Sequence, residues 1–138
     1  MNIKKVLSIL AIVIVVLNLS HIIYSDFVKP NPQEELKSSF QEYFTDGDER
    51  IEMVWFSSQG KTISIALEIS GLGEKPKNIE LVKQNSRAYV TDKVCSSPKL
   101  KNFIQNGNYI SVDIRNKEEN YSTVKNIMNI TMSAKKCL

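Results

Sequence analysis

The sequence predicts an α+β fold, in which an antiparallel sheet of about four strands, arranged as two hairpins, is covered on one face by helices. Two stretches, 61–70 and 109–115, alternate apolar and polar residues with the period of a half-buried strand. Apolar residues recur at helical spacing in 33–44, in 77–94 and again after Pro98. Glycine and polar clusters separate these stretches, so each is predicted to be one element of a single domain.

The first half of the domain is predicted to hold a helix and a hairpin. Leu36, Phe40 and Phe44 are spaced as one face of an amphipathic helix. Residues 50–56 and 61–70 then read as strands, and the polar residues between them form a loop of hairpin length.

The two strands of this hairpin disagree about which face is apolar. In the second strand every large apolar residue falls on one face, which is therefore predicted to be core. In the first strand Met53 and Trp55 match that face, yet Val54 and Phe56 fall on the opposite one. Two alternatives stay open: the preceding helix covers Val54 and Phe56, or they are exposed and contribute to binding a protein partner.

The second half is predicted to begin with two helices. Residues 77–94 give a long helical stripe, although polar residues weaken it midway. Ser97 is a good N-cap and Pro98 suits the first helical position. Gly107 suits the left-handed residue that ends a helix, so a short helix is predicted between them.

A second hairpin is predicted to close the domain. Ile110, Val112 and Ile114 share one face of a strand over 109–115. A polar turn follows, and residues 121–132 are rich in β-branched residues, which favours a last strand.

The last third of the chain also carries a pattern of spaced residues. Cys95, Pro98 and Leu100 form C-x-x-P-x-L, followed by Gly107, an alternating strand, a polar turn, another strand and Cys137. This pattern resembles a widespread group of small exported bacterial proteins that have no established activity. The resemblance supports a disulfide between Cys95 and Cys137 and the predicted topology, and it implies no catalytic residue. Two cysteines in an exported chain normally pair structurally, and their wide spacing argues against a redox role.

The N-terminus predicts an export signal. Lys4 and Lys5 precede an apolar stretch. Its clean core of about fourteen residues suits a cleaved signal peptide, whereas residues 6–24, at about nineteen, are long enough for a membrane anchor. Both alternatives stay open. The positive-inside tendency places everything from Ser25 onward outside the cytoplasm.

The predicted organisation therefore has three parts: a signal peptide or signal anchor at 1–25, an extended spacer at 26–33, and one α+β domain at 34–138. Pro30 and Pro32 make the spacer stiff and extended. The predicted location is the bacterial inner membrane with the domain in the periplasm, or the periplasm itself if the signal is cleaved.

The charge balance does not indicate nucleic-acid binding. The chain has 18 basic and 15 acidic residues and a net charge of +3. Two of the basic residues lie in the N-terminal signal, which leaves 16 basic against 15 acidic residues for the rest of the chain. Such a balance lacks the strongly basic footprint of a nucleic-acid-binding domain.

No catalytic, metal or cofactor site is predicted. The single histidine, His21, lies in or beside the apolar stretch, so neither a nucleophilic triad nor a zinc site has an imidazole in the domain. Asp46, Asp48 and Glu49 are acidic but lack the spacing of a calcium loop. The glycines form no dinucleotide or phosphate motif. An enzyme, a cofactor and a small-molecule substrate are therefore not predicted.

These observations favour a membrane-anchored or periplasmic interaction module with a protein partner, such as an accessory component of an envelope secretion or conjugation assembly. The alternative is an inhibitor or immunity protein that neutralises an exported toxin. Retention of the anchor favours the first, and tight one-to-one binding to the product of a neighbouring gene favours the second.

Overall fold

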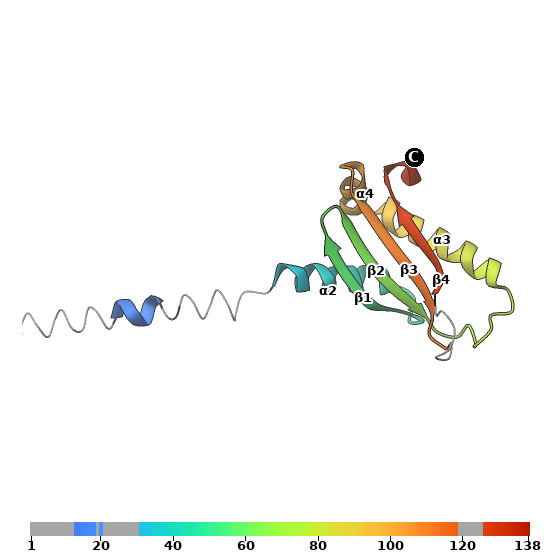
Figure 1. The fold of residues 1–138 in the computed structure, drawn as a ribbon, viewed down its shortest axis with the longest axis horizontal. Helices are drawn as coiled ribbons and strands as arrows, with labels where there is room; N and C mark the ends of the chain where they lie inside the picture. The colour runs from blue at the N-terminus through green and yellow to red at the C-terminus, as the bar shows by residue number, and fades with distance from the viewer. Residues whose placement is uncertain (1–12, 19, 21–30, 119–125) are drawn as a thin grey trace, which may run out of the picture. The chain divides into compact units, whose positions relative to one another are not determined.

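The computed structural model describes residues 13–18, 20, 31–118 and 126–138. Contacts divide the chain into a unit of residues 1–35 and a unit of residues 36–138. The elements follow in the order α2 (Pro32–Thr45), β1 (Ile51–Gln59), β2 (Thr62–Ile69), α3 (Ile79–Ser96), α4 (Pro98–Gln105), β3 (Tyr109–Asn116), β4 (Asn126–Met132) and η2 (Ala134–Cys137). Figure 1 shows this arrangement.

In the N-terminal unit, residues 13–18 and 20 are helical and expose their side chains. Among the described residues, no helix is long and apolar enough to cross a membrane. The signal or anchor predicted over 6–24 and the spacer predicted over 26–33 lie for the most part outside the described residues.

The α+β class and the four strands are confirmed, but the sheet is mixed rather than antiparallel. The strand order is β1-β2-β3-β4. The two outer pairs are antiparallel, whereas β2 and β3 run parallel with Ile65 opposite Val112. The physical reason is the connection: α3 and α4 return the chain to the end where β2 began, so β3 starts there and runs the same way.

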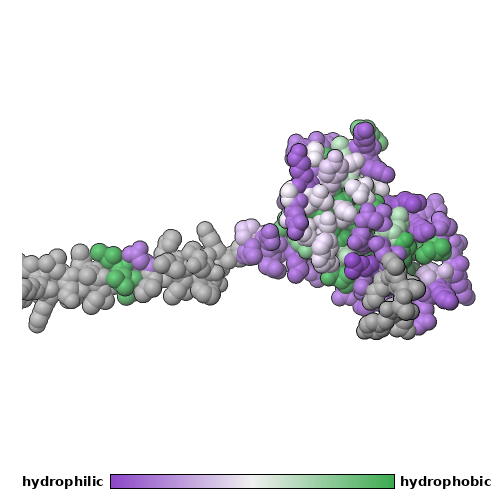
Figure 2. All heavy atoms as spheres, viewed as in Figure 1, coloured by the Kyte–Doolittle hydropathy of each residue, from purple (hydrophilic) through white to green (hydrophobic). Residues whose placement is uncertain are grey.

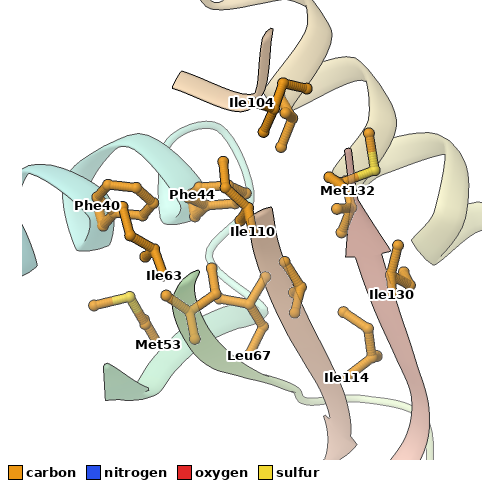
Figure 3. Packing of buried hydrophobic residues seen from close by; sticks show 14 residues of the cluster. Phe40, Phe44, Met53, Ile63, Leu67, Ile104, Ile110, Ile114, Ile130 and Met132 are labelled. Carbon is orange, nitrogen blue, oxygen red and sulfur yellow. The ribbon is translucent and has the colours of Figure 1, made fainter. Parts of the chain in front are cut away.

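The core lies between the sheet and the helices. Figure 3 shows Phe40 and Phe44 of α2 close to Ile63 of β2 and Ile110 of β3. The helices α3 and α4 add Val90, Val94 and Ile104, and the remaining members of this buried cluster come from the strands: Met53, Ile65, Leu67, Val112, Ile114, Ile130 and Met132. Burial of these side chains is the main stabilising contribution to the fold.

Local signals set the ends of the helices. The Asn78 side chain accepts a hydrogen bond from the Leu81 N–H at 3.1 Å and so caps α3. Ser97 caps α4 in the same way through the Leu100 N–H, and Pro98 follows in the first turn. Gly107 has a φ of +82°, the left-handed conformation expected where a helix ends.

The disulfide ties the end of the chain to the helices. Cys95 in α3 is bonded to Cys137 in η2, with the two Cα atoms 5.3 Å apart. This bond closes a segment with a sequence separation of 42 residues that contains α4, β3 and β4.

A second cross-connection joins two loops at the opposite end of the sheet. The Glu118 carboxylate accepts hydrogen bonds from the Gly71 and Gly73 N–H groups at 2.5 and 2.7 Å. The buried Asn116 side chain donates to the Gly73 carbonyl at 2.7 Å. The loop between β2 and α3 is therefore held against the end of β3.

Candidate protein-binding surface

A β-bulge in β1 resolves the conflict over which face of the first strand is apolar. Met53 lies opposite Leu67, whereas Trp55 lies opposite Ala66 and the register shifts between them. Val54 is the extra residue, and a bulge of this kind inverts the side-chain alternation beyond it. The strand also continues to Gln59, so the hairpin turn is shorter than the predicted loop, with Gln59 paired to Thr62.

Because of the bulge, Phe56 lies on the core side of the sheet whereas Val54 is exposed. Phe56 lies opposite the buried Ile65 and packs against Phe40 of α2, with the ring centroids 5.6 Å apart. The prediction that Val54 and Phe56 share one face is therefore wrong, and so is the placement of Trp55 with Met53. An unbroken apolar run, 53–56, within an otherwise alternating strand was the sequence signal for this bulge.

Val54 and Trp55 instead form an exposed apolar pair, which we call the Val54–Trp55 patch. Their exposed fractions are 40% and 47%. Trp55 shares the outer face of the sheet with Ala66, opposite the face that carries the core. Because β1 is first in the strand order, it pairs with β2 alone within the described sheet, and its other edge is unpaired there.

Polar side chains of β3 and β4 lie on the same outer face. Asn129 donates hydrogen bonds to the Asp113 carboxylate at 2.6 Å and to the Ser111 hydroxyl at 3.0 Å. Thr131 donates to the Asn129 side-chain oxygen at 3.2 Å. In the view of Figure 2, the surface over the strands is mainly pale and purple, as expected for these residue types. The Val54–Trp55 patch is therefore an apolar spot at the edge of a polar surface.

Two clefts lie on the helix side of the sheet. One of about 240 Å³ is lined by Ile51, Ile69, Val82 and Ile114 among others. The second, of about 440 Å³, lies between α2 and α4 and includes Leu36, Tyr43, Leu100 and Phe103 in its lining.

An ion pair and a tyrosine hydroxyl with a raised pKa line the first cleft. The Arg50 guanidinium donates to the Asp48 carboxylate at 2.7 Å and holds the pKa of that carboxyl below its usual range. Partial burial, followed by the charges of Asp48 and Asp46, raises the pKa of the Tyr89 hydroxyl. Within the described residues, no cluster of three or more metal-binding side chains is found.

Comparisons with known proteins place the fold. No protein-family model matches the chain, and no curated protein matches it. The type II secretion system pilotin AspS of Vibrio cholerae aligns with a TM-score of 0.53 and 11% sequence identity, over 76% of this chain and 84% of that one. The Vibrio vulnificus type II pilotin EpsS aligns with a TM-score of 0.52 and 16% identity, over 77% of this chain and 94% of that one.

A third solved structure, of a Pseudomonas aeruginosa protein described as secreted, aligns with a TM-score of 0.50 and 15% identity, over 77% of this chain and 92% of that one. At these identities the three similarities establish a shared fold.

Proposed function

We propose that this protein is an exported, protein-binding accessory component of an envelope secretion or conjugation assembly. Its fold is that of two type II secretion pilotins and covers most of the length of each. The predicted export signal and the disulfide agree with a location outside the cytoplasm. The chain is membrane-anchored if residues 6–24 are retained and periplasmic if they are removed. No catalytic step is part of this proposal.

The observation that supports a protein partner is the Val54–Trp55 patch. Tryptophan at the centre of an interface contributes more binding energy than most residues, because it buries a large area at little entropic cost. The unpaired edge of β1 offers backbone N–H and C=O groups. An extended segment of a partner could form hydrogen bonds with these groups and so add a further strand to the sheet. We therefore assign partner binding to Val54 and Trp55, while Phe56 supports the strand from the core side.

Affinity capture with the full chain, expressed in its own host at native level, tests this assignment. We expect the wild type to capture a component of an envelope secretion or conjugation assembly. The variant Val54→Ser with Trp55→Ser should lose that component. The matched control is Leu81→Ser, because Leu81 is exposed to a similar extent, 49%, but lies on α3.

Three further outcomes decide the proposal. Deletion of the gene should reduce export by the same assembly. Equal capture by the patch variant and the wild type would remove the Val54–Trp55 patch as the site. Capture of one exported toxin, in place of an assembly component, would replace the proposed function with that of an inhibitor or immunity protein.

A further inference from the structure

Several secondary-structure elements begin or end at the same end of the mixed sheet. Because β2 and β3 are parallel, both begin at the same end, where β1 and β4 finish. Figure 1 shows the turn between β1 and β2, the helix α4 and the C-terminus at this end. The Tyr109 N–H donates to the Lys61 carbonyl at 2.8 Å, and the disulfide holds η2 near α4.

Three segments at this end carry lysines and no acidic side chain. The segments 57–64, 95–112 and 131–138 contain five lysines and neither aspartate nor glutamate. We call this surface the basic end, and its lysines are Lys61, Lys99, Lys101, Lys135 and Lys136. All are exposed except Lys101, which is half-buried.

The ammonium groups of the basic end are available to an external anion. Within the described residues, none of the five lysines forms an ion pair with a carboxylate. The other end of the sheet differs, because it also carries acidic side chains, two of which pair with cations: Asp48 with Arg50 at 2.7 Å and Glu52 with Lys117 at 2.8 Å. The separation of charge is therefore a property of the fold, although the net charge is small.

Apolar groups lie among these lysines. Tyr109 is 45% exposed and Leu138 is fully exposed. In Figure 2 hydrophobic atoms appear at the C-terminus beside hydrophilic ones. Tyrosine favours the level of lipid headgroups, and lysine extends its charge to water while its methylene stem contacts apolar surroundings.

We propose that the basic end docks on a membrane surface rich in anionic phospholipids. The lysines would meet the phosphate groups, while Tyr109 enters the interfacial layer. The five lysines are spread over three segments, which suits the diffuse negative potential of an anionic membrane. Bidentate binding of a single carboxylate on a protein partner would favour arginine instead. This inference is independent of the Val54–Trp55 patch and of whether residues 1–25 are retained.

A fluorescence experiment on the full chain tests the docking. Trp55 is the only tryptophan, so Trp55→Phe combined with Tyr109→Trp moves the single indole to the basic end. The protein is mixed with nanodiscs that contain brominated phosphatidylcholine, with or without phosphatidylglycerol. We expect bromine to quench the indole in the anionic nanodiscs, with little quenching in neutral ones. Raising the ionic strength to about 0.5 M should remove the difference, because salt screens the attraction.

Charge variants of the same protein locate the contact. Neutralising Lys135 and Lys136 as Lys135→Gln with Lys136→Gln should lower the docking equilibrium constant about fivefold for each lysine. The matched control is Lys75→Gln with Lys77→Gln, two exposed lysines in the loop that follows β2 at the opposite end. This control should dock as the parent does.

Several results would overturn the proposal: equal quenching in neutral and anionic nanodiscs, no quenching in either, or equal losses for the two lysine pairs. Salt-sensitive binding of poly-glutamate without quenching by anionic lipid would assign the basic end to an acidic protein and reject the membrane. If Tyr109→Trp impairs folding, hydrogen exchange of the wild-type chain replaces it. Docking then predicts protection of residues 98–109 and 133–138 in anionic nanodiscs alone.

Discussion

Lys93 connects two helices through a single ammonium group. Its Nζ donates to the Tyr43 carbonyl at 2.9 Å and the Asp46 carbonyl at 3.2 Å, at the C-terminal end of α2. The same ammonium lies over the Tyr43 ring, 4.8 Å from its centroid. In return, the Tyr43 hydroxyl donates to the Lys93 carbonyl at 2.7 Å. A cation from α3 thus satisfies carbonyls that the end of α2 leaves unpaired.

Replacement of this cation should destabilise the domain. We expect Lys93→Met to lower the free energy of unfolding by about 1–2 kcal/mol, because it keeps the apolar stem but removes charged hydrogen bonds. Chemical denaturation measures the change. The control Lys83→Met lies on the same helix, where Lys83 pairs with the exposed Glu80, and should change stability by no more than about 0.5 kcal/mol. Equal effects of the two substitutions would contradict the capping role.

Glu118 gives the fold a dependence on pH. Hydrogen bonds from the backbone N–H groups, that of Gly71 first, lower the pKa of this carboxyl below its ordinary value of 4.5. A carboxyl with a lowered pKa in the folded state stabilises the fold above the unfolded value, and this contribution is lost as pH falls through the folded value. Glu118→Gln should therefore be less stable than the wild type at neutral pH, and the gap should close as pH falls below 4.5. Denaturation across this pH range measures it, and a constant gap would contradict the assignment.

At the scale of elements, the bulge in β1 assigns different roles to adjacent aromatic residues. Phe56 packs on Phe40, whereas Trp55 is 47% exposed. We expect Phe56→Ala to cost about 2–3 kcal/mol of stability, because it leaves a cavity under α2. Trp55→Ala should cost less than about 1 kcal/mol, because an exposed side chain loses little packing. Thermal denaturation compares them, and a larger loss for Trp55→Ala would place the indole in the core.

The boundaries of α4 were predictable because their signals are local: the Ser97 side chain and the positive φ of Gly107 act within a few residues of the helix. The long helix was predicted over 77–94, whereas α3 spans Ile79–Ser96 and is capped by Asn78. The bulge was less predictable. Either Val54 or Trp55 could have been the extra residue, and only pairing with Ala66 and packing of Phe56 on Phe40 select Val54.

At the scale of the whole molecule, the disulfide constrains the unfolded chain. Closing a segment with a sequence separation of 42 residues should stabilise the domain by about 4 kcal/mol in the chain-entropy model. That is a large share of the roughly 5–15 kcal/mol typical of a domain. Denaturation should therefore show a marked loss of stability on reduction, and Cys95→Ser with Cys137→Ser should match the reduced wild type. Titration of two free thiols in protein isolated from an oxidising compartment would contradict the pairing.

The sequence by itself determined the class of the fold, the order of its elements and the ends of α4, because periodicity and capping are properties of neighbouring residues. Only the tertiary structure decided that β2 and β3 are parallel, since strand direction depends on where α3 and α4 return the chain. The parallel pairing of β2 and β3 brings Lys61, α4 and η2 to one end of the sheet, and these segments form the basic end. The bulge likewise directs Trp55 outward and Phe56 into the core, because the register of one strand is set by the strand and helix that pack against it.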